Sequence, residues 1–547
     1  MREKVGPLGD AAGPTPAVGR RDDGGKSSRP GRLLAVFKAV VLLALAATTA
    51  YGMLKSGIYP ERLWLPVADG VLVLLLVTLF VRGYYGDVPQ ASWIMVTFLA
   101  ALVGVKGLSM VWTVSETETV NEVLRSSTYL ALFVVALGAL SSGRQVGPLM
   151  DVAILMVAAI AGYGLLQKIN PAEYPIRSML VDEVRVDSTL GYANSTAIVL
   201  AMGVVLALAR STTMRNALLR GLYAALTLAF LVTLYLTFSR GGIGSLVAGL
   251  ILLFVLTEKR LQTLVNLLIL SIPGAWLLWR IQSLQGFSQT GLSEGQRVVL
   301  GTAFRNDLVV ALAAAFVLQT GYALVVNRYE LMPLGRRALG GLAVVAAVLA
   351  VGAGALAVVN EYGGVGRAYE MLVSNPARTE NAAQRLASLD LGFREAYWRV
   401  GWEAWKERPL TGTGAGTFKY TWLENRTEPR DVQQVHNLYL EQGTETGVFA
   451  FLALVGFVVA LVGFSARAAW RARGERRLLL AGLVSALAVY LLSSVLEWHW
   501  YIPGSTLFFF LLAAITAKFA CREDWGVPEA DVRPPDGENI PDERPRP

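Results

Sequence analysis

The sequence predicts an all-α integral membrane protein, a polytopic bundle of about 12 to 14 transmembrane helices with a long extracytoplasmic loop that contains amphipathic helices. Hydrophobic residues make up 54% of the 547 residues and charged residues only 16%, a balance that a water-soluble globule of this length could not bury. Apolar runs of roughly 18 to 25 residues recur along the chain, each long enough to cross about 30 Å of hydrocarbon. No stretch alternates at period two as a membrane β-barrel requires, so the crossings are predicted to be helices.

About fourteen crossings are predicted, and twelve or thirteen are open alternatives because the limits of apolar runs are soft. They lie at residues 33–51, 64–81, 92–112, 123–140, 148–166, 191–209, 217–237, 241–256, 262–279, 304–326, 338–359, 436–464, 478–497 and 502–518.

Both ends of the chain are predicted to be disordered cytoplasmic tails. Residues 1–32 are rich in glycine, proline and arginine, and their charges lie too far from the first apolar run for a typical cleaved signal peptide. Residues 520–547 are acidic and proline-laden, so they cannot bury enough apolar surface to fold alone. Between the tails we predict N-terminal transmembrane helices over 33–189, a central region over 190–465 and C-terminal transmembrane helices over 466–519.

The placement of basic residues predicts the orientation. The positive-inside rule assigns to the cytoplasm the turns that carry Arg82, Arg144, Arg210 to Arg220, Lys259 and Arg260, Arg328 to Arg337, and Arg467 to Arg477. The net charge of +8 is then explained by topology and anionic lipid, and no basic module with interleaved aromatic residues indicates nucleic-acid binding. The long connections 167–190, 280–303 and 360–435 are predicted to face outward.

The external loop at 360–435 is too long to be a simple connection and is a candidate functional element. Within it, residues 385–409 place leucine, phenylalanine, tyrosine and tryptophan at helical spacing and end at a proline, which predicts a helix lying against the outer leaflet. The glycine-rich stretch "PLTGTGAGTFKY" (409–420) lacks the Gly-Lys-Ser/Thr ending of a P-loop. We predict that this stretch packs the loop back onto the bundle.

Arg240 is the first candidate site residue, because Gly241, Gly242 and a new helix follow it at the outer edge of a crossing. A helix start offers unpaired N–H groups, glycines allow close approach, and a guanidinium carries a permanent charge suited to phosphate. The alternative is an arginine that extends to the membrane edge beside a tight helical hairpin. Arg394 and Arg399 could join it to hold a lipid-linked pyrophosphate, or their stems could simply cover apolar surface.

The chain holds only two histidines, and His436 directly precedes a membrane-length apolar run. A place at a helix N-terminus disfavours the imidazolium, so His436 is predicted to be neutral and able to act as a general base, with a helix cap or a lipid-headgroup contact as the alternative. Glu445 lies deeper on the same run and is expected to find a partner on another element, in a functional or a structural role. His499 is expected in the aromatic belt, and no metal site is predicted because the histidines are far apart and carry no ligand spacing.

Four stretches in order resemble the O-antigen ligase and O-antigen polymerase superfamily of bacterial membrane enzymes. They are "LGYANSTAIVLAMG" (190–203), "SRGG" (239–242), "REAYW" followed by "ERPLTGTGAGTF" (394–418), and "HNLYLEQGTETGVFAFL" (436–452). The resemblance covers roughly residues 190–461, and the earlier helices match only in being apolar. The family usually shows Asn-Pro-Asn where this chain has Ala-Asn-Ser at 193–195, and the crossing near 304–326 exceeds the family's commonest count.

The resemblance implies glycosyl transfer on the outer face of the inner membrane, from a polyprenyl-pyrophosphate-linked glycan to a hydroxyl of a glycan, lipid or protein. By resemblance, Arg240 and Arg394 bind the donor's pyrophosphate and His436 activates the acceptor hydroxyl, without cofactor, metal or nucleotide sugar. Arg399 is expected as a further donor-binding cation. Supporting roles are expected for Gly241, Gly242, Asn194, Asn437 and Glu445. Residues 190–465 are then the catalytic region, and both termini are cytoplasmic.

Three alternatives remain open at the level of sequence. Ligase and polymerase differ only in the acceptor and share the donor chemistry. A polysaccharide or lipid transporter or flippase, without covalent chemistry, is a different class, although ionisable side chains deep inside the predicted spans are few, with Lys106 and Glu445 as the exceptions. A non-catalytic membrane scaffold is the third.

Overall fold

The computed structural model describes residues 29–176, 184–284, 286–328, 391–426 and 428–522, together with residues 356, 367, 370 and 386. Within this part of the chain the protein is all-helical, with 15 α-helices and no strand, as the sequence predicts. Twelve of these helices are long and apolar enough to cross a membrane.

The helices of the first half run from α1 to α10. They are α1 (Arg29–Leu54), α2 (Glu61–Phe80), α3 (Gln90–Leu108), α4 (Glu116–Ala139), α5 (Val146–Ile169), α6 (Ala193–Thr213), α7 (Ala217–Leu236), α8 (Arg240–Leu256), α9 (Arg260–Ser283) and α10 (Glu294–Arg328). The second half contributes α13 (Arg394–Glu407), α14 (Phe418–Asn425), α15 (Leu438–Arg471), α16 (Gly474–Ser493) and α17 (Pro503–Ala520), with the 3₁₀ turn η6 (His499–Tyr501) between the last two.

The predicted crossings and the observed helices agree closely. Twelve of the predicted crossings correspond to the spanning helices, whereas the run at 241–256 forms α8, a shorter apolar helix of 17 residues. The predicted crossing at 338–359 lies outside the described residues except for Leu356, and so do the tails at 1–28 and 523–547. The first helix begins at Arg29, so the last residues assigned to the N-terminal tail are helical.

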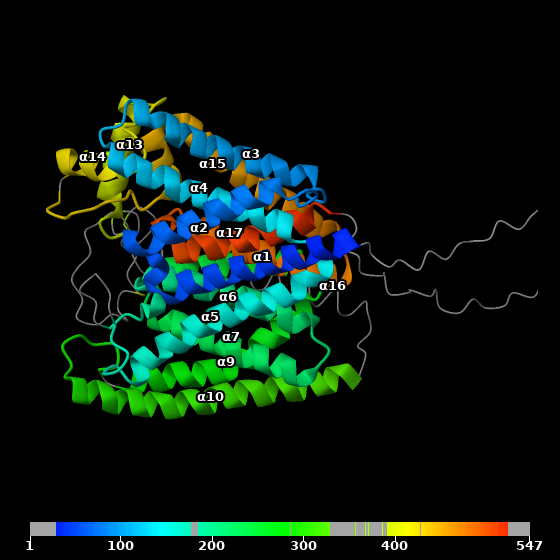
Figure 1. Ribbon diagram of the computed structural model, residues 1–547. Helices are drawn as coiled ribbons and strands as arrows, with labels where there is room; N and C mark the ends of the chain where they lie inside the picture. Colours follow the sequence, from blue (N-terminus) through cyan, green and yellow to red (C-terminus); the bar gives the residue numbers. More distant parts are fainter. Residues whose placement is uncertain are drawn as a thin grey trace, which may run out of the picture.

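The bundle is built around α6, α16 and α17, which are almost entirely buried among the other helices. Figure 1 shows the long helices running side by side, with α9 and α10 along one flank and α3 and α15 along the other. Small residues permit close contact at the centre. A Cβ on Gly249 of α8 would lie 2.4 Å from the side chain of Val489 on α16, so glycine is required for these two helices to pack.

A break in α15 receives the glycine-rich turn. Gly447 has φ 75° and ψ −172°, outside the helical region, which interrupts the helix near its first third. The turn fills the interruption, since the Gly414 amide donates to the Glu445 carbonyl at 2.7 Å and the Val448 amide donates to the Pro409 carbonyl at 2.9 Å. This confirms the prediction that residues 409–420 pack the loop onto the bundle.

The amphipathic helix α13 forms part of the predicted external loop and packs on α15. It begins at Arg394 and buries Tyr397, Val400 and Ala404, while Trp402 is half exposed. Figure 1 shows α13 and α14 together at one end of the bundle. The earlier part of the predicted helix, residues 385 and 387–390, lies outside the described residues.

Three of the turns that carry basic residues lie together, at the ends of α6 and α8 and at the start of α16. At the end of α6, Arg210 pairs with Asp151 at 2.7 Å. Nearby, Lys259 donates to the Thr212 carbonyl at 2.9 Å, and Arg477 lies 3.7 Å from Glu258. The starts of α6 and α8 and the end of α16, which form the pocket described below, are therefore separated from the basic turns by the length of these helices.

Candidate functional site

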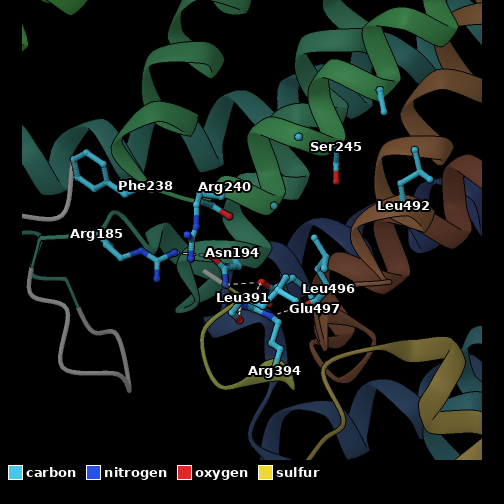
Figure 2. A pocket seen from close by; sticks show the side chains of 14 residues that line it. Arg185, Asn194, Phe238, Arg240, Ser245, Leu391, Arg394, Leu492, Leu496 and Glu497 are labelled. Atoms are coloured by element: carbon cyan, nitrogen blue, oxygen red, sulfur yellow. Dashed lines mark hydrogen bonds and ion pairs between the residues drawn. The ribbon is translucent and has the colours of Figure 1, made fainter. Parts of the chain in front are cut away.

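A cavity of about 430 Å³ lies where the starts of α6, α8 and α13 meet the end of α16. Figure 2 shows Arg185, Arg240 and Arg394 around it, with Asn194 and Glu497 between them. The other lining groups are small or apolar. Residues more than 200 positions apart thus form one cationic pocket, here called the arginine pocket.

Arg240 enters the arginine pocket from the first turn of α8. Ser239 caps this helix, because its hydroxyl accepts a hydrogen bond from the Gly242 amide at 3.2 Å. Gly241 lines the pocket, whereas Gly242 faces α6, where an added Cβ would lie 2.6 Å from that of Ala197. The two glycines therefore have different roles, one beside the cavity and one in helix packing.

Arg394 enters from the opposite wall, at the first residue of α13. Its Nε donates to the Leu496 carbonyl at 2.7 Å, its Nη1 donates to the Leu391 carbonyl at 3.2 Å, and its Nη2 forms an ion pair with Glu497. Burial by itself lowers the pKa of this guanidinium, but the Glu497 carboxylate more than offsets the effect and the pKa lies above its usual value. Arg394 is thus held as a fixed cation in a defined orientation.

Glu497, in the connection between α16 and η6, is the acceptor that the polar groups of the arginine pocket share. It is buried, and it accepts hydrogen bonds from the Asn194 side-chain amide at 2.7 Å and from the Tyr192 hydroxyl at 2.8 Å in addition to Arg394. On the far side of Asn194, Arg185 donates to the amide oxygen at 2.5 Å. Asn194, expected to support the site, therefore connects its polar groups.

His436 lies beside the arginine pocket but is not part of its lining. The centre of its ring lies 5.4 Å from that of Tyr397, in a tilted arrangement, and 6.2 Å from that of Trp498, the neighbour of Glu497, in an edge-to-face arrangement. Among the described residues its Nδ1 has no hydrogen-bond partner. Burial and then the nearby Arg394 charge lower the pKa of His436 well below its usual value, so the ring is neutral at physiological pH.

The backbone of His436 is left-handed, and hydrogen bonds fix the residues before and after it. His436 has φ 59°, the left-handed region that non-glycine residues seldom adopt. After it, the Asn437 side chain caps α15 by accepting from the Tyr439 and Leu440 amides, both at 3.1 Å. Before it, the Val435 amide donates to the buried Glu441 carboxylate at 2.9 Å. This turn presents the ring toward α13 and Trp498.

Arg399 is not brought to the arginine pocket. It lies further along α13, its side chain is 52% exposed, and it sits 3.5 Å from Glu395 one turn earlier on the same helix. Five residues at 3.6 per turn place it about 140° around the helix from Arg394, which accounts for the different surroundings.

The contacts of Glu445 give it a structural role. It is buried at the break in α15, and its carboxylate accepts from the backbone amides of Gly416 at 2.8 Å and Phe418 at 3.0 Å. Its partner is therefore the glycine-rich turn, and the carboxylate fastens this turn into the interrupted helix.

The expectation for His499 was wrong. The ring is fully buried between α16 and α17, where its Nε2 lies 3.2 Å from the Ser493 hydroxyl and 3.0 Å from the Ser494 hydroxyl. Burial lowers the pKa of His499 to about 3. The η6 turn folds the ring inward instead of toward an interfacial belt, and the two hydroxyls inside the bundle lie within hydrogen-bond distance of Nε2.

Arg185, Glu441 and Glu497 were missed by the reasoning from sequence. A charged residue between apolar or aromatic neighbours, as in "VLEWHW" around Glu497, is the one local signal that could have drawn attention to the last of them. As for metal binding, the described part of the chain contains no cluster of three or more histidine, cysteine, aspartate or glutamate side chains that could hold an ion.

Comparison with known proteins gives a family for part of the chain. No curated protein matches it. Residues 298–455 match the model of a family described as O-antigen ligase (Wzy_C). The match includes Arg394, Arg399, His436, Asn437 and Glu445, whereas the residues of the pocket that come from α6 and α8 precede it. The chain is therefore a multi-span membrane protein that is similar to the O-antigen ligase family over residues 298–455.

Proposed function

We propose that this protein transfers a glycan from a polyprenyl-pyrophosphate carrier to an acceptor hydroxyl at the outer face of the inner membrane. The observation that carries the proposal is the convergence of Arg240 and Arg394, 154 positions apart in sequence, on one cavity that His436 adjoins. Fixed guanidinium groups match the charge and geometry of a pyrophosphate, and a neutral imidazole can accept a proton.

In the proposed reaction His436 acts on the acceptor hydroxyl, and the two arginines act on the leaving pyrophosphate. The acceptor oxygen attacks the anomeric carbon of the donor glycan while its proton passes to His436. The bond between the anomeric carbon and the phosphate oxygen breaks, and its electron pair remains on the polyprenyl pyrophosphate. Arg240 and Arg394 stabilise the charge that develops on this leaving group, and a single displacement inverts the anomeric carbon. In this proposal the arginines supply the positive charge, so no metal ion is needed.

The outer location is inferred from the charge distribution. The arginine pocket lies at the ends of α6, α8 and α16 remote from the basic turns, and basic turns favour the cytoplasmic side. The site is then placed where a lipid carrier exposes its phosphate groups at the membrane surface.

The buried charges of the spans favour an enzyme over an ion-coupled transporter. Lys106 lies 3.1 Å from Glu122, and Glu445 is held by two backbone amides. Both of the deep ionisable groups singled out from sequence are thus engaged in contacts within the protein. A carrier that couples transport to an ion requires a charge that changes partner during the cycle.

The test is donor turnover by the purified protein in nanodiscs. A polyprenyl-pyrophosphate-linked glycan is supplied alone or with a lipid or protein acceptor, and both the released polyprenyl pyrophosphate and the glycan product are measured. Ladder formation with the donor alone indicates a polymerase, and a product that requires the added acceptor indicates a ligase. Turnover that persists in EDTA supports the metal-free reaction. Flipping of the donor in proteoliposomes without any glycan product would contradict the proposal.

A further inference from the structure

A pair of partly exposed aromatic side chains adjoins His436 outside the lining of the arginine pocket. They are Trp498, in the connection between α16 and η6, and Tyr59, in the connection between α1 and α2. Their ring centres lie 5.6 Å apart in an edge-to-face arrangement, and the centre of the His436 ring lies 6.2 Å from that of Trp498. The residue proposed as the base therefore borders aromatic surface that the arginine pocket does not use.

Buried groups hold Trp498 in place. Tyr192 packs against it with ring centres 4.8 Å apart, and the Tyr192 hydroxyl donates to the Glu497 carboxylate at 2.8 Å. Tyr192 and Glu497 are both buried, whereas Trp498 keeps part of its surface exposed among the described residues. An aromatic ring with few rotatable bonds and a fixed neighbour loses little conformational freedom when a ligand covers it. Trp498 is thus a preformed contact surface beside the base.

Polar groups lie next to the aromatic pair. The Tyr59 hydroxyl donates to the Gln433 side-chain oxygen at 3.4 Å, at an exposed position three residues before His436. Binding sites for small molecules combine aromatic or apolar surface with a few polar groups that set the orientation of the ligand. A sugar ring has the matching surface, since its C–H groups form an apolar face and its hydroxyls point outward around the ring. The aromatic pair and its polar neighbour therefore fit a sugar.

The direction of the proposed displacement places the acceptor on this side. In that reaction the acceptor oxygen attacks the anomeric carbon from the face opposite the leaving pyrophosphate, which the arginine pocket binds. The acceptor hydroxyl must also come within hydrogen-bond distance of His436. Trp498 meets both conditions, because it contacts His436 and does not line the arginine pocket.

We propose that Trp498 and Tyr59 bind the acceptor as a sugar ring, stacked on Trp498 with one hydroxyl toward His436. The inference rests on the proposed function, and it adds an acceptor subsite and the chemical class of the acceptor. Because the donor's phosphates are bound in the arginine pocket, loss of an aromatic ring is expected to weaken acceptor binding and to leave pyrophosphate binding unchanged.

The first experiment offers the donor in nanodiscs to four acceptors. Two carry sugar, namely the carrier-free glycan released from the same donor and octadecyl β-glucoside. Two carry none, namely octadecanol and a serine-containing peptide. The wild type is expected to attach the glycan to a sugar acceptor or to the donor glycan itself, and linkage analysis of the product identifies the new bond. Attachment to octadecanol or to the peptide would overturn the inference.

The second experiment uses variants of the aromatic pair. Trp498→Ala and Tyr59→Leu are expected to raise the acceptor KM by about fivefold or more, because ring stacking is lost. Where the donor serves as its own acceptor, the donor KM takes this place. Trp498→Phe and Tyr59→Phe keep an aromatic face and should show a smaller rise. In every variant the inhibitory concentration of inorganic pyrophosphate should change by less than about twofold, because the arginine pocket is a separate site.

Trp279→Leu is the matched control. Trp279 is 60% exposed near the end of α9, where its ring lies beside Arg280, so this variant should behave as the wild type. Tyr59→Leu decides the outcome if Trp498→Ala does not fold, because Tyr59 lies in a partly exposed connection. An unchanged acceptor KM in the folded variants would overturn the inference, and so would an equal change in pyrophosphate inhibition.

The two proposals fail in different ways. If the aromatic variants behave as the wild type while R240A and R394A are inactive, the acceptor subsite is wrong and the proposed function stands. If the wild type forms no glycan product with the donor alone or with any of the four acceptors, the proposed function itself fails.

Discussion

The carboxylate of Glu497 forms an ion pair with the guanidinium of Arg394, which lies 103 positions earlier in the sequence. The pair joins the connection that follows α16 to the first residue of α13. It therefore ties the amphipathic helix to the bundle at the same point where it orients a cation toward the pocket. A buried carboxylate with this many partners has both a structural and an electrostatic role.

Removing the carboxylate tests both roles. Glu497→Ala leaves Arg394 and Asn194 without their shared partner, and breaking a buried ion pair is expected to cost about 3 kcal/mol of unfolding free energy. Glu497→Gln keeps the volume and part of the hydrogen bonding, so the loss should be smaller. Thermal unfolding in detergent and donor turnover measure the two effects. If Glu497→Ala were as stable and as active as the wild type, Glu497 would have neither role.

The second prediction compares two arginines on one helix. Arg394 lines the pocket and Arg399 does not, although both belong to α13. Arg394→Ala is expected to reduce donor turnover by about 10²-fold or more, as loss of a group that stabilises developing charge does. Arg399→Ala should stay within about twofold, because its partner is Glu395 on the exposed surface. If both variants lost donor turnover equally, a position in the arginine pocket would not be what makes an arginine important for turnover.

The third prediction concerns pH. The pKa of His436 is lowered from 6.5 by burial and by Arg394, so the neutral base persists as the pH falls through 6.5. Tyr397 and Trp498 are the rings packed against it, and neither carries a charge in this range. The acid limb of kcat/KM is therefore expected below pH 6.5. Arg394→Lys serves as a control that retains the charge, and Arg394→Gln, if it keeps measurable activity, should move the limb toward 6.5. A wild-type limb at or above 6.5 would contradict the assignment of His436 as the base.

The sequence predicts those features of the fold and the site that depend on residues close together in the chain. Length and apolarity of a run are local, so the spanning helices were predicted one by one, and the glycine-rich turn was recognised because it lacks a P-loop ending. Arg240 and Arg394 were identified through motifs of consecutive residues. Arg185 and Glu497 were missed because their significance depends on each other and on Asn194, which only the packed bundle brings within hydrogen-bond distance. Arg399 was included because proximity in sequence was taken for proximity in space.

The fourth prediction concerns the support of the histidine turn. Glu441 is buried, accepts from the Val435 amide and pairs with the Tyr501 hydroxyl, so it fixes the residue before the left-handed backbone of His436. Glu441→Ala is expected to lower kcat by about tenfold or more while the donor KM changes by less than about threefold, because the base is displaced but the arginine pocket is intact. Glu441→Gln, which can still accept from Val435, should recover part of the rate. An equal rise of the donor KM would point to a general disturbance of the fold instead.

The fifth prediction compares two glycines that contact or belong to the broken helix. Gly412 has φ 62°, and a Cβ there would lie 2.3 Å from the Glu445 backbone carbon, so Gly412→Ala must displace the turn from the break in α15. Gly463 lies on the same helix with no atom within 4 Å of an added Cβ, and alanine there is expected to be neutral or to stabilise by up to about 1 kcal/mol. Gly412→Ala should lower the unfolding temperature and reduce turnover together, because the turn follows α13 and is hydrogen-bonded to α15, the helix that begins beside His436. Thermal unfolding and donor turnover of both variants test whether the turn stabilises the interrupted helix. If Gly412→Ala unfolds like Gly463→Ala, the interrupted helix does not depend on the turn that fills it.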